Sequence, residues 1–380
     1  MHDLKVEIVG PDRLEAADLA LWTQWVAQNP GLTGPYFDPL YVCSIGATVP
    51  GAAVARIMAA DDVIAFLPFQ KRGGVIQPLG APLTDFHGLI CAPGSEIDLP
   101  AVLRRIGGRR LEFNGWVNGA GVEGQTRQRL YADLSSGFGA YYRQCYDAHR
   151  KVYRNIERCR RNMERDLPDL AFSWERTTPQ LIDWVIGHKR QQFHRTALHD
   201  VFTCGWTRDL LVRLSEDTTD GFGLMAGVYR RGDTVIAAEI ALRSGDSLHL
   251  WLPAYEADYG RYGPGIALSL DILKAASADG IVRVDFGCGD ETYKATMTTH
   301  AEPCVEGRVV TRPSIALPYP AARAIGARLA IIRACETRAE GQVRAVWHLG
   351  RRLMKRARTA TVAFLGILGL TGAALIAEML

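Results

Sequence analysis

The stretch from residue 223 to residue 242 reads GLMAGVYRRGDTVIAAEIAL, and this stretch decides the fold class. Two apolar runs, Gly223–Arg230 and Thr234–Leu242, flank the turn residues Gly232 and Asp233. Apolar runs separated by a short glycine-containing turn are typical of a β-hairpin. The sequence therefore predicts two antiparallel strands here.

The residues around this hairpin predict strands alternating with helices. After it, Ser247–Leu252 and Ile281–Phe286 read as strands, and Ile266–Ala278 between them reads as a helix that ends before Gly280. Other expected elements are a short helix starting at Glu291, helices over 139–165 and 179–197, and a strand over 170–176. This order indicates an α/β protein with mixed sheets.

A weak internal repeat suggests a duplicated domain. Residues 60–65 read ADDVIA and residues 232–237 read GDTVIA, and each opens an apolar strand after an acidic turn. A chain of 380 residues is also too long for one average domain. We expect an N-terminal half over 1–135, a second half over 136–312 and a tail over 313–380.

Composition excludes some broad classes of protein. The chain is 48% hydrophobic and 22% charged, which argues against wholesale disorder. Its 44 Lys and Arg against 41 Asp and Glu argue against a dedicated nucleic-acid binder. The eight cysteines form no C-x-x-C pair, and MHDLKVEIVG at the start is no secretory signal. These features predict free thiols and a cytoplasmic location.

The tail differs from the rest of the chain. Residues 320–358 contain ten Arg or Lys and two Glu, and residues 359–377 are uncharged. A basic stretch before an apolar one can associate with an anionic membrane surface. The alternative is a helix packed on the protein or on a second copy, and the sequence leaves both open.

One glycine motif and the histidines yield negative predictions. Residues 119–124 match G-x-G-x-x-G, but residues 128–134 after it read as a strand where a dinucleotide site needs a helix. We interpret the motif as a turn. The nine histidines show no pair at metal-ligand spacing on one face, so no metal is predicted.

The turn Tyr262-Gly263-Pro264-Gly265 precedes the predicted helix. Glycines at a helix start allow close approach of a ligand, and the free N–H groups favour an anion such as a pyrophosphate. An ordinary turn with proline in the first helical turn explains the same residues.

A polar cluster is expected at the end of the apolar strand 281–286, where Asp285 lies, with Asp290, Tyr293 and Lys294 just after it. Ligands of open α/β sheets usually lie at such strand ends. A carboxylate there can deprotonate a nucleophile, and a tyrosine can protonate a leaving group. The plain alternative is a helix cap at Asp290 with a surface lysine.

Two further stretches carry dense polar groups. Residues 149–161 place positive charge on most of a helix, which suits a phosphate or an acidic glycan but also an ordinary solvated face. Residues 189–200 read KRQQFHRTALHD at a helix end, and capping explains only Thr196 or Asp200.

Taken together, these motifs resemble those of the CelD/BcsL-like acetyltransferases, which belong to the GNAT superfamily and are related to the FemAB-type tandem fold. The resemblance covers about residues 35–310. It rests on the order of these blocks: FDPLYV (37–42), IAFLPFQ (64–70), PLGAPLTDFHG (78–88), YRN (153–155), residues 189–200, LWLPAY (250–255), YGPG (262–265) and DFGCGDETYK (285–294). The family usually has a basic residue where Cys288 stands.

The resemblance implies two GNAT-like halves and acyl transfer from acetyl-CoA or another acyl-CoA. It also implies a sugar or polysaccharide precursor as acceptor, in exopolysaccharide or cellulose synthesis, with a polysaccharide-synthase complex as a partner reached through the tail. One departure concerns the phosphate turn, where Gly260 stands at a position that usually carries Gln or Arg and Pro264 removes an amide.

The expected mechanism assigns roles to named residues. Asp285 is expected to be the base, and Tyr293 the acid that protonates the thiolate. Donor contacts are expected from Trp251, Tyr262, Gly263, Gly265 and Lys294, and acceptor contacts from Asp85, His87, Tyr153, Arg154, Lys189, Gln192, Asp200 and Asp290. Two alternatives stay open: a FemAB-type transferase that uses aminoacyl-tRNA, and a non-catalytic partner of a membrane polysaccharide synthase.

Overall fold

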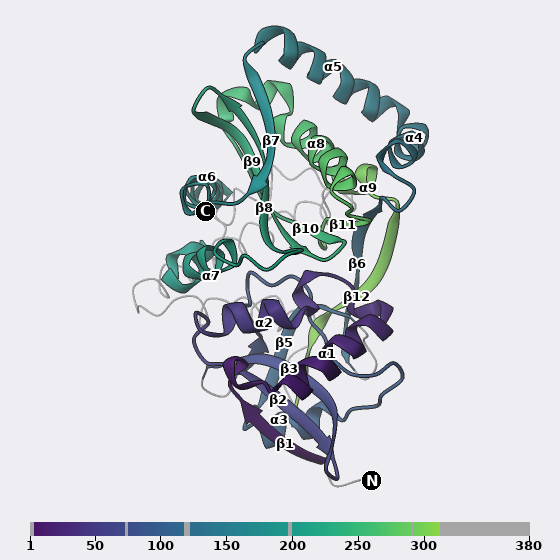
Figure 1. Ribbon diagram of the computed structural model, residues 1–380, viewed down its shortest axis with the longest axis vertical. Coiled ribbons are helices and arrows are strands. Elements are labelled where there is room, and N and C mark those ends of the chain that lie inside the picture. Colours follow the sequence, from purple (N-terminus) through teal and green to yellow (C-terminus); the bar gives the residue numbers. More distant parts are fainter. Residues whose placement is uncertain (1–3, 73–74, 118–121, 197–199, 290–291, 312–380) are drawn as a thin grey trace, which may run out of the picture.

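The computed structural model describes residues 4–72, 75–117, 122–196, 200–289 and 292–311 (Figure 1). The strands are β1 (Leu4–Val9), β2 (Ala52–Ala59), β3 (Asp62–Arg72), β4 (Val75–Pro78), β5 (Arg110–Trp116), β6 (Glu123–Asp133), β7 (Leu170–Arg176), β8 (Phe222–Arg231), β9 (Thr234–Ser244), β10 (Ser247–Tyr255), β11 (Arg283–Asp285) and β12 (His300–Val310). The α-helices are α1 (Ala16–Gln28), α2 (Pro39–Gly46), α3 (Leu99–Arg105), α4 (Phe138–Ala148), α5 (Arg150–Asp166), α6 (Pro179–Thr196), α7 (Gly205–Ser215), α8 (Pro264–Ala278) and α9 (Thr292–Met297). Short 3₁₀ helices are η1 (Pro11–Arg13), η2 (Pro30–Leu32), η3 (Pro35–Phe37), η4 (Val201–Thr203) and η5 (Ala257–Tyr262).

The described strands form one mixed sheet in the order β1-β2-β3-β4-β5-β12-β6-β11-β10-β9-β8-β7. Read inward from either edge, the two halves of this sheet repeat the same pattern. Antiparallel neighbours lead to one parallel pair, which is β4 with β5 in the first half and β10 with β11 in the second. The predicted α/β class and the predicted duplication are confirmed by this order.

Two strands exchange places across the middle of the sheet. β12 comes late in the chain but pairs with β5, and β6 comes early but pairs with β11. β12 and β6 also pair with each other over nine residues, from His300 to Arg308 on β12. Each half of the sheet is therefore completed by a strand from the other part of the chain, on either side of the expected boundary at residue 135.

The predicted hairpin is confirmed as β8 and β9. Gly232 in its turn has a φ of +54°, a conformation that costs glycine nothing because it lacks a Cβ. The predicted helix over 139–165 is interrupted, because His149, with φ −128° and ψ 41°, leaves the helical region between α4 and α5. The break lets each piece bury its own apolar face, with Tyr141 on α4 and Tyr153 on α5.

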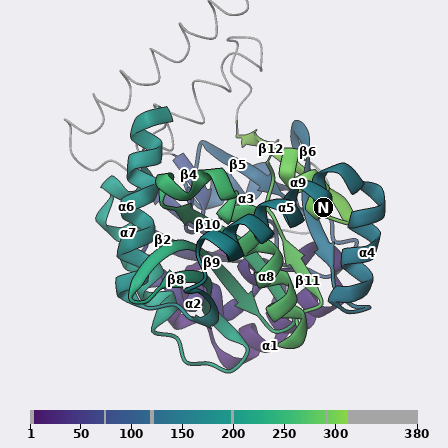
Figure 2. The ribbon, with the colours of Figure 1, turned by 90° about the horizontal axis from the view of Figure 1, so that it is seen from above.

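Helix α8 packs very closely against one face of the second half (Figure 2). At Gly227 on β8, an added Cβ would lie 2.2 Å from Cγ1 of Ile272 on α8, well inside van der Waals contact. A larger residue there would push helix and sheet apart. This packing holds the N-terminal end of α8 close to the end of β10.

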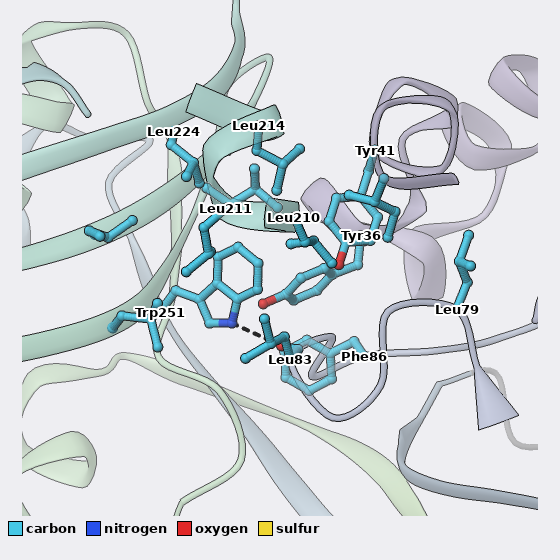
Figure 3. Packing of buried hydrophobic residues seen from close by; sticks show 14 of the residues in the cluster. Tyr36, Tyr41, Leu79, Leu83, Phe86, Leu210, Leu211, Leu214, Leu224 and Trp251 are labelled. Carbon is cyan, nitrogen blue, oxygen red and sulfur yellow. Dashed lines mark hydrogen bonds between the residues drawn. The ribbon is translucent and has the colours of Figure 1, made fainter. Parts of the chain in front are cut away.

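The opposite face of the second half is shared with the first half (Figure 3). Leu210 and Leu211 of α7 and Trp251 of β10 pack in one cluster with Tyr36 and Phe86 of the first half. Nε1 of Trp251 donates a hydrogen bond to the carbonyl oxygen of Leu83 at 2.9 Å, satisfying the one polar atom of this buried side chain. The two halves are thus joined by a common apolar core as well as by the sheet.

The tail over 313–380, with its expected basic and apolar segments, lies outside the described residues. None of the helices in the described ranges has the length and apolar character that a membrane crossing requires.

Candidate active site

The parallel pair β10 and β11 separates abruptly near the centre of the molecule. The two strands pair only over 247–249 and 283–285, after which β11 ends and β10 continues to Tyr255. The pairing of β10 with β9 shifts register between Leu250 and Leu252, just past the point of separation. A bulge of this kind bends the strand and leaves backbone groups without a ladder partner. The last paired residues, His249 and Asp285, therefore mark the closed end of an opening between the strands.

A cavity of about 520 Å³ extends from the free part of β10. It lies between α6 on one side and the start of α8 on the other, with Tyr293 of α9 also in its wall. The lining residues are His188, Lys189, Gln192, Arg195, Pro253, Ala254, Tyr255, Ala257, Gly260, Gly263, Pro264, Gly265, Ile266, Ser269 and Tyr293. Five of the predicted site residues meet here: Lys189, Gln192, Gly263, Gly265 and Tyr293.

The N-terminal end of α8 forms one wall of the cavity and is open to it. Gly263 has a left-handed φ of +61°, which turns the chain from η5 into the helix. Added Cβ atoms would meet nothing within 4 Å at Gly263, and only Cδ1 of Tyr255, at 3.9 Å, at Gly265. The first-turn N–H groups and the helix dipole favour an anion at this end. Lys189 and Arg195 add positive charge, and no carboxylate belongs to the described residues that line the cavity.

A buried carboxylate lies behind this wall. Ser269 Oγ donates to Glu239 Oε2 at 2.9 Å, and Glu239 on β9 is only 4% exposed. Burial raises the pKa of Glu239, although its hydrogen bond from Ser269 and the charges of Lys189 and Lys294 counteract this. Glu239 was not among the predicted site residues, and its signal in the sequence is a single acid inside the apolar strand TVIAAEIAL.

At the closed end of the opening, Asp285 is held in a tight ion pair. The residue is 1% exposed, and Arg129 Nε of β6 donates to Oδ2. The backbone N–H of Gly287 donates to Oδ1 at 2.8 Å. Burial by itself would raise the pKa of Asp285, but the Arg129 charge and the contact with His249 hold it well below its usual range. A carboxylate so stabilised as an anion is a weak proton acceptor.

His249 continues this ion pair into a chain of alternating charge. Its Nδ1 lies 3.4 Å from Asp285 Oδ1, and its Nε2 lies 2.9 Å from Asp85 Oδ2. Burial opposes protonation, but hydrogen bonds to Asp285 and Asp85 and their charges outweigh it, so the pKa of His249 is raised above 6.5. The side chain of Asp85 is 39% exposed, so the chain runs from buried Arg129 to a carboxylate that reaches solvent.

This chain of charges also connects the two halves. Asp85 belongs to the first half, whereas His249 and Asp285 lie on β10 and β11 of the second. The His249 ring packs edge-on against Tyr36, with ring centroids 4.9 Å apart. Two buried polar atoms of this cluster, Tyr36 Oη and Arg129 Nη1, have no hydrogen-bond partner among the described residues. Such groups are costly unless a ligand or water satisfies them, so the cluster has the polarity of a binding site.

His249 was not among the site residues predicted from the sequence. Its signal was a single histidine within SLHLWL, an otherwise apolar strand, where an ionisable side chain needs a partner from elsewhere in the chain. The partner Asp85 is separated from it by 164 residues.

The remaining predicted site residues lie away from the cavity. Trp251 is in the shared core, and Tyr153 is fully buried in the core under α5. Tyr262 is 4% exposed and donates its hydroxyl to Asp166 Oδ2 at 3.2 Å. Arg154 is exposed on α5, and Asp200 caps η4 and pairs with Arg190 at 2.7 Å.

His87 and the residues after β11 complete the account of the predicted site. His87 is buried, with Nε2 2.9 Å from Asn114 Oδ1, and burial lowers its pKa to about 4. Lys294 is half-buried on α9, and Asp290 lies outside the described residues. Within the described residues no group of three or more His, Cys, Asp or Glu gathers to hold a metal, and the absence of a metal stays a prediction.

The raised pKa of His249 predicts a pH-dependent contribution to stability. Because the folded-state pKa lies above the ordinary value, the contribution is fully present below about pH 6.5 and is lost as the pH rises through the raised pKa. We expect the urea midpoint of the wild type to fall more steeply above pH 6.5 than that of His249→Gln. At pH 6 the variant should be less stable by about 3–5 kcal/mol, because it breaks a buried charge pair.

His87→Gln is the matched control, since His87 is also buried but stays neutral across this range. Above pH 6.5 the urea midpoint of His87→Gln should fall with pH as steeply as that of the wild type, whatever the overall stability of the variant. Parallel curves for wild type and His249→Gln would show that His249 carries no charge in the folded protein.

Comparison with known proteins gives a family for the second half. Residues 150–295 match the acetyltransferase (GNAT) domain family. The chain is similar to the solved structure of FemX, with 10% identity, coverage of 84% of this chain and 99% of that one, and a TM-score of 0.50. It also resembles a tandem GNAT protein from the clavulanic acid biosynthesis pathway, with 9% identity, coverage of 82% and 100%, and a TM-score of 0.49.

No curated protein matches the sequence. At such low identity the likeness to FemX shows the fold alone. The family match covers the cavity and the separating strands, and a GNAT domain implies an acyl-CoA donor. Residues 150–295 of the chain thus form a GNAT acetyltransferase domain, and acyl transfer from acyl-CoA is the activity that such a domain indicates.

Proposed function

We propose that this protein transfers an acyl group, with acetyl as the simplest case, from acyl-CoA to an acceptor held between its two halves. The observation that carries the proposal is the cavity that borders Pro253–Tyr255 of β10, past the point where this strand leaves β11, and reaches the open N-terminus of α8. An acyl-CoA donor has a thioester, a long polar arm and a diphosphate. These three parts match, in that order, the opening between the strands, the backbone of β10 and the N-terminus of α8.

The donor's diphosphate is assigned to the start of α8. The first-turn amides there, including those of Gly265 and Ile266, supply donors, and Lys189 and Arg195 supply countercharge. The pantetheine arm is assigned to the segment Pro253–Tyr255 of β10, whose backbone groups, apart from the N–H that Pro253 lacks, suit its amides. This places the thioester near the closed end of the opening.

Tyr293 is proposed as the general acid. It lies in the cavity wall, on the helix that follows β11. When the acceptor attacks the thioester carbonyl, the C–S bond breaks and a thiolate leaves. The Tyr293 hydroxyl protonates this thiolate, and backbone N–H groups near the register shift at Leu250 and Leu252 stabilise the oxyanion.

Asp85, at the solvent-exposed end of the row of charges, is proposed to take the proton that the acceptor loses. Asp285 was expected to be the base, but its ion pair with Arg129 makes it a weak one, and its burial separates it from an acceptor. Asp85 has both an exposed side and a fixed orientation, because His249 holds Oδ2. We therefore propose that Asp85 takes the proton, directly or through water, and that Asp285 positions His249.

The acceptor class is proposed from the sequence resemblance. A sugar or polysaccharide precursor fits the CelD/BcsL-like blocks, among them the one that contains Asp85. Lys189 and Gln192 reach the cavity from α6 and are proposed to contact the acceptor or the donor's polar arm. A cytoplasmic location, with the basic tail at an anionic membrane surface or a synthase complex, belongs to the same proposal and rests on the sequence of residues 320–377.

Donor binding provides the first test. Gly265→Val places a branched side chain in the cavity where an added Cβ has nothing nearer than 3.9 Å, so the protein should fold while the donor is displaced. We expect calorimetric titration of the full-length protein to show acetyl-CoA and CoA binding, and at least a ~10-fold weaker affinity in Gly265→Val, equal to about 1.4 kcal/mol.

Lys274→Val serves as the control, because it introduces the same residue on the exposed side of the same helix. Lys274 does not line the cavity, so this variant should bind acetyl-CoA and CoA like the wild type. Equal affinities in all three proteins would remove the donor from this cavity. A folded wild type that binds no CoA would point to the FemAB-type aminoacyl-tRNA donor or to a scaffold.

The role of Tyr293 is tested by turnover. Tyr293→Phe removes only the hydroxyl, so kcat should fall by roughly 10²–10⁴-fold while KM for acetyl-CoA changes little. Amino sugars are first screened as acceptors, and the one that gives the fastest turnover is used. The rate is then measured as CoA release by chromatography. Tyr255→Phe alters another tyrosine of the same cavity and should stay close to wild type. A kcat for Tyr293→Phe within a few-fold of wild type would exclude Tyr293 as the acid.

A further inference from the structure

Two cysteines that are distant in sequence meet beside the proposed active site. Sγ of Cys288 and Sγ of Cys304 lie 2.9 Å apart, and both residues are free cysteines. Cys288 follows β11 three residues after Asp285, and Cys304 lies in the middle of β12. Figure 1 shows β11, β6 and β12 as neighbours below α9. The pair therefore bridges the segment that leads to Tyr293 and the strand exchanged between the halves.

The surroundings suit oxidation of this pair. Cys304 is 1% exposed, whereas Cys288 is half-buried and within reach of a small oxidant. Arg127 on β6 pairs with Cys304 in the sheet, and its Nη2 donates to the carbonyl oxygen of Cys288 at 3.3 Å. The hydrogen bond from Cys288 and the charge of Arg127 lower the pKa of Cys304, although burial opposes this. In the same pair the contact with Cys304 and burial raise the pKa of Cys288. Oxidation is therefore favoured by the 2.9 Å between the two Sγ atoms and by the partial exposure of Cys288.

We propose that Cys288 and Cys304 form a reversible disulfide when the protein meets a peroxide. A disulfide has an S–S length of about 2.05 Å, so the two sulfur atoms need to approach by only about 0.9 Å. In the reaction the two S–H bonds and the O–O bond break and the S–S bond forms. The two sulfurs are oxidised, and hydrogen peroxide takes up two electrons and the two thiol protons and leaves as two waters.

The disulfide would tie the segment after β11 to β12. That segment connects Asp285, in its ion pair with Arg129, to α9 with Tyr293. Reduction by a thiol such as glutathione would release it. The proposal concerns the cysteines alone and holds whether or not the chain uses acyl-CoA.

Tryptic peptide mapping of the full-length protein tests it. Cleavage after Arg283, Lys294 and Arg308 yields the peptides 284–294 and 295–308, each with one cysteine. The reduced protein is treated with a small excess of hydrogen peroxide, blocked with N-ethylmaleimide and digested without reductant. We expect the two peptides to be joined, with a mass two hydrogens below their sum, and to separate on reduction.

Thermal unfolding gives a second readout. A disulfide would close the loop between Cys288 and Cys304 and restrict the unfolded chain. Peroxide should therefore raise the Tm of the wild type by several degrees. The rise should vanish in Cys288→Ser, a change at a half-buried position that the fold tolerates, and in Cys304→Ser. It should persist in Cys159→Ser, which alters another half-buried cysteine on α5.

The results that overturn the proposal are distinct. Maleimide on both Cys288 and Cys304 after peroxide treatment means that the pair stays reduced. Sulfinic or sulfonic acid on Cys288 with no joined peptide means that oxidation occurs without a bond to Cys304. A Tm rise that survives in Cys288→Ser assigns the effect to other thiols.

Discussion

Asp285 is a carboxylate buried where two strands separate, so its negative charge must be balanced by nearby positive groups. The residues that balance this charge come from distant parts of the chain and hold those parts together. An isolated charge at 1% exposure costs more than a domain can offset, so each charge needs an opposite partner. Arg129 comes from the exchanged strand β6, His249 from β10 and Asp85 from the first half. Removal of one member leaves its neighbour unpaired in the core. The strand exchange and the contact between halves are thus required by the same row of charges.

The two ends of the proposed site differ in electrostatic character. The α8 end offers helix amides, Lys189 and Arg195, which suit the phosphates of a donor. The closed end of the strand opening offers Asp85, a carboxylate held in place by His249. An anionic donor and an acceptor that must lose a proton would therefore be drawn to different ends and meet at the thioester. The fold explains this difference in charge between the two ends of the site. One end is the N-terminus of α8, and the other end faces the first half, which contributes Asp85.

Local sequence patterns predicted the elements well and the pairings poorly. The β8–β9 hairpin, α8 and β10 follow from turn residues and hydrophobic periodicity, which depend on neighbouring residues. The exchange of β6 and β12 depends on contacts across some 170 residues, which no local pattern records. For the same reason Asp285 was expected to be a base. Its partner Arg129 is 156 residues away, and only the fold shows that the pair neutralises it.

Part of the cavity lining was predicted from the sequence for related reasons, and its function stays a prediction. Gly263, Gly265 and Tyr293 lie next to a helix start or a strand end, where sequence marks exposed backbone and side chains, and they do line the cavity. Trp251, Tyr262 and Tyr153 were expected to touch ligands, yet they pack in cores. A large aromatic residue in a motif block looks the same in the sequence whether it contacts a ligand or packs in the core. In the structure, the alternation of side chains along β10 places Trp251 on the face that meets Leu83.

In the proposed function, an acyl-CoA thioester lies at the opening between β10 and β11, between the α8 terminus and Asp85. The decisive experiment is a crystal structure of the full-length protein with bound acetyl-CoA. We expect the diphosphate on the amides of Gly265 and Ile266, the pantetheine along Pro253–Tyr255, and the thioester between Tyr293 and the His249–Asp85 pair. Acetyl-CoA bound with its diphosphate elsewhere, or with its thioester pointing away from β11, would contradict this proposal.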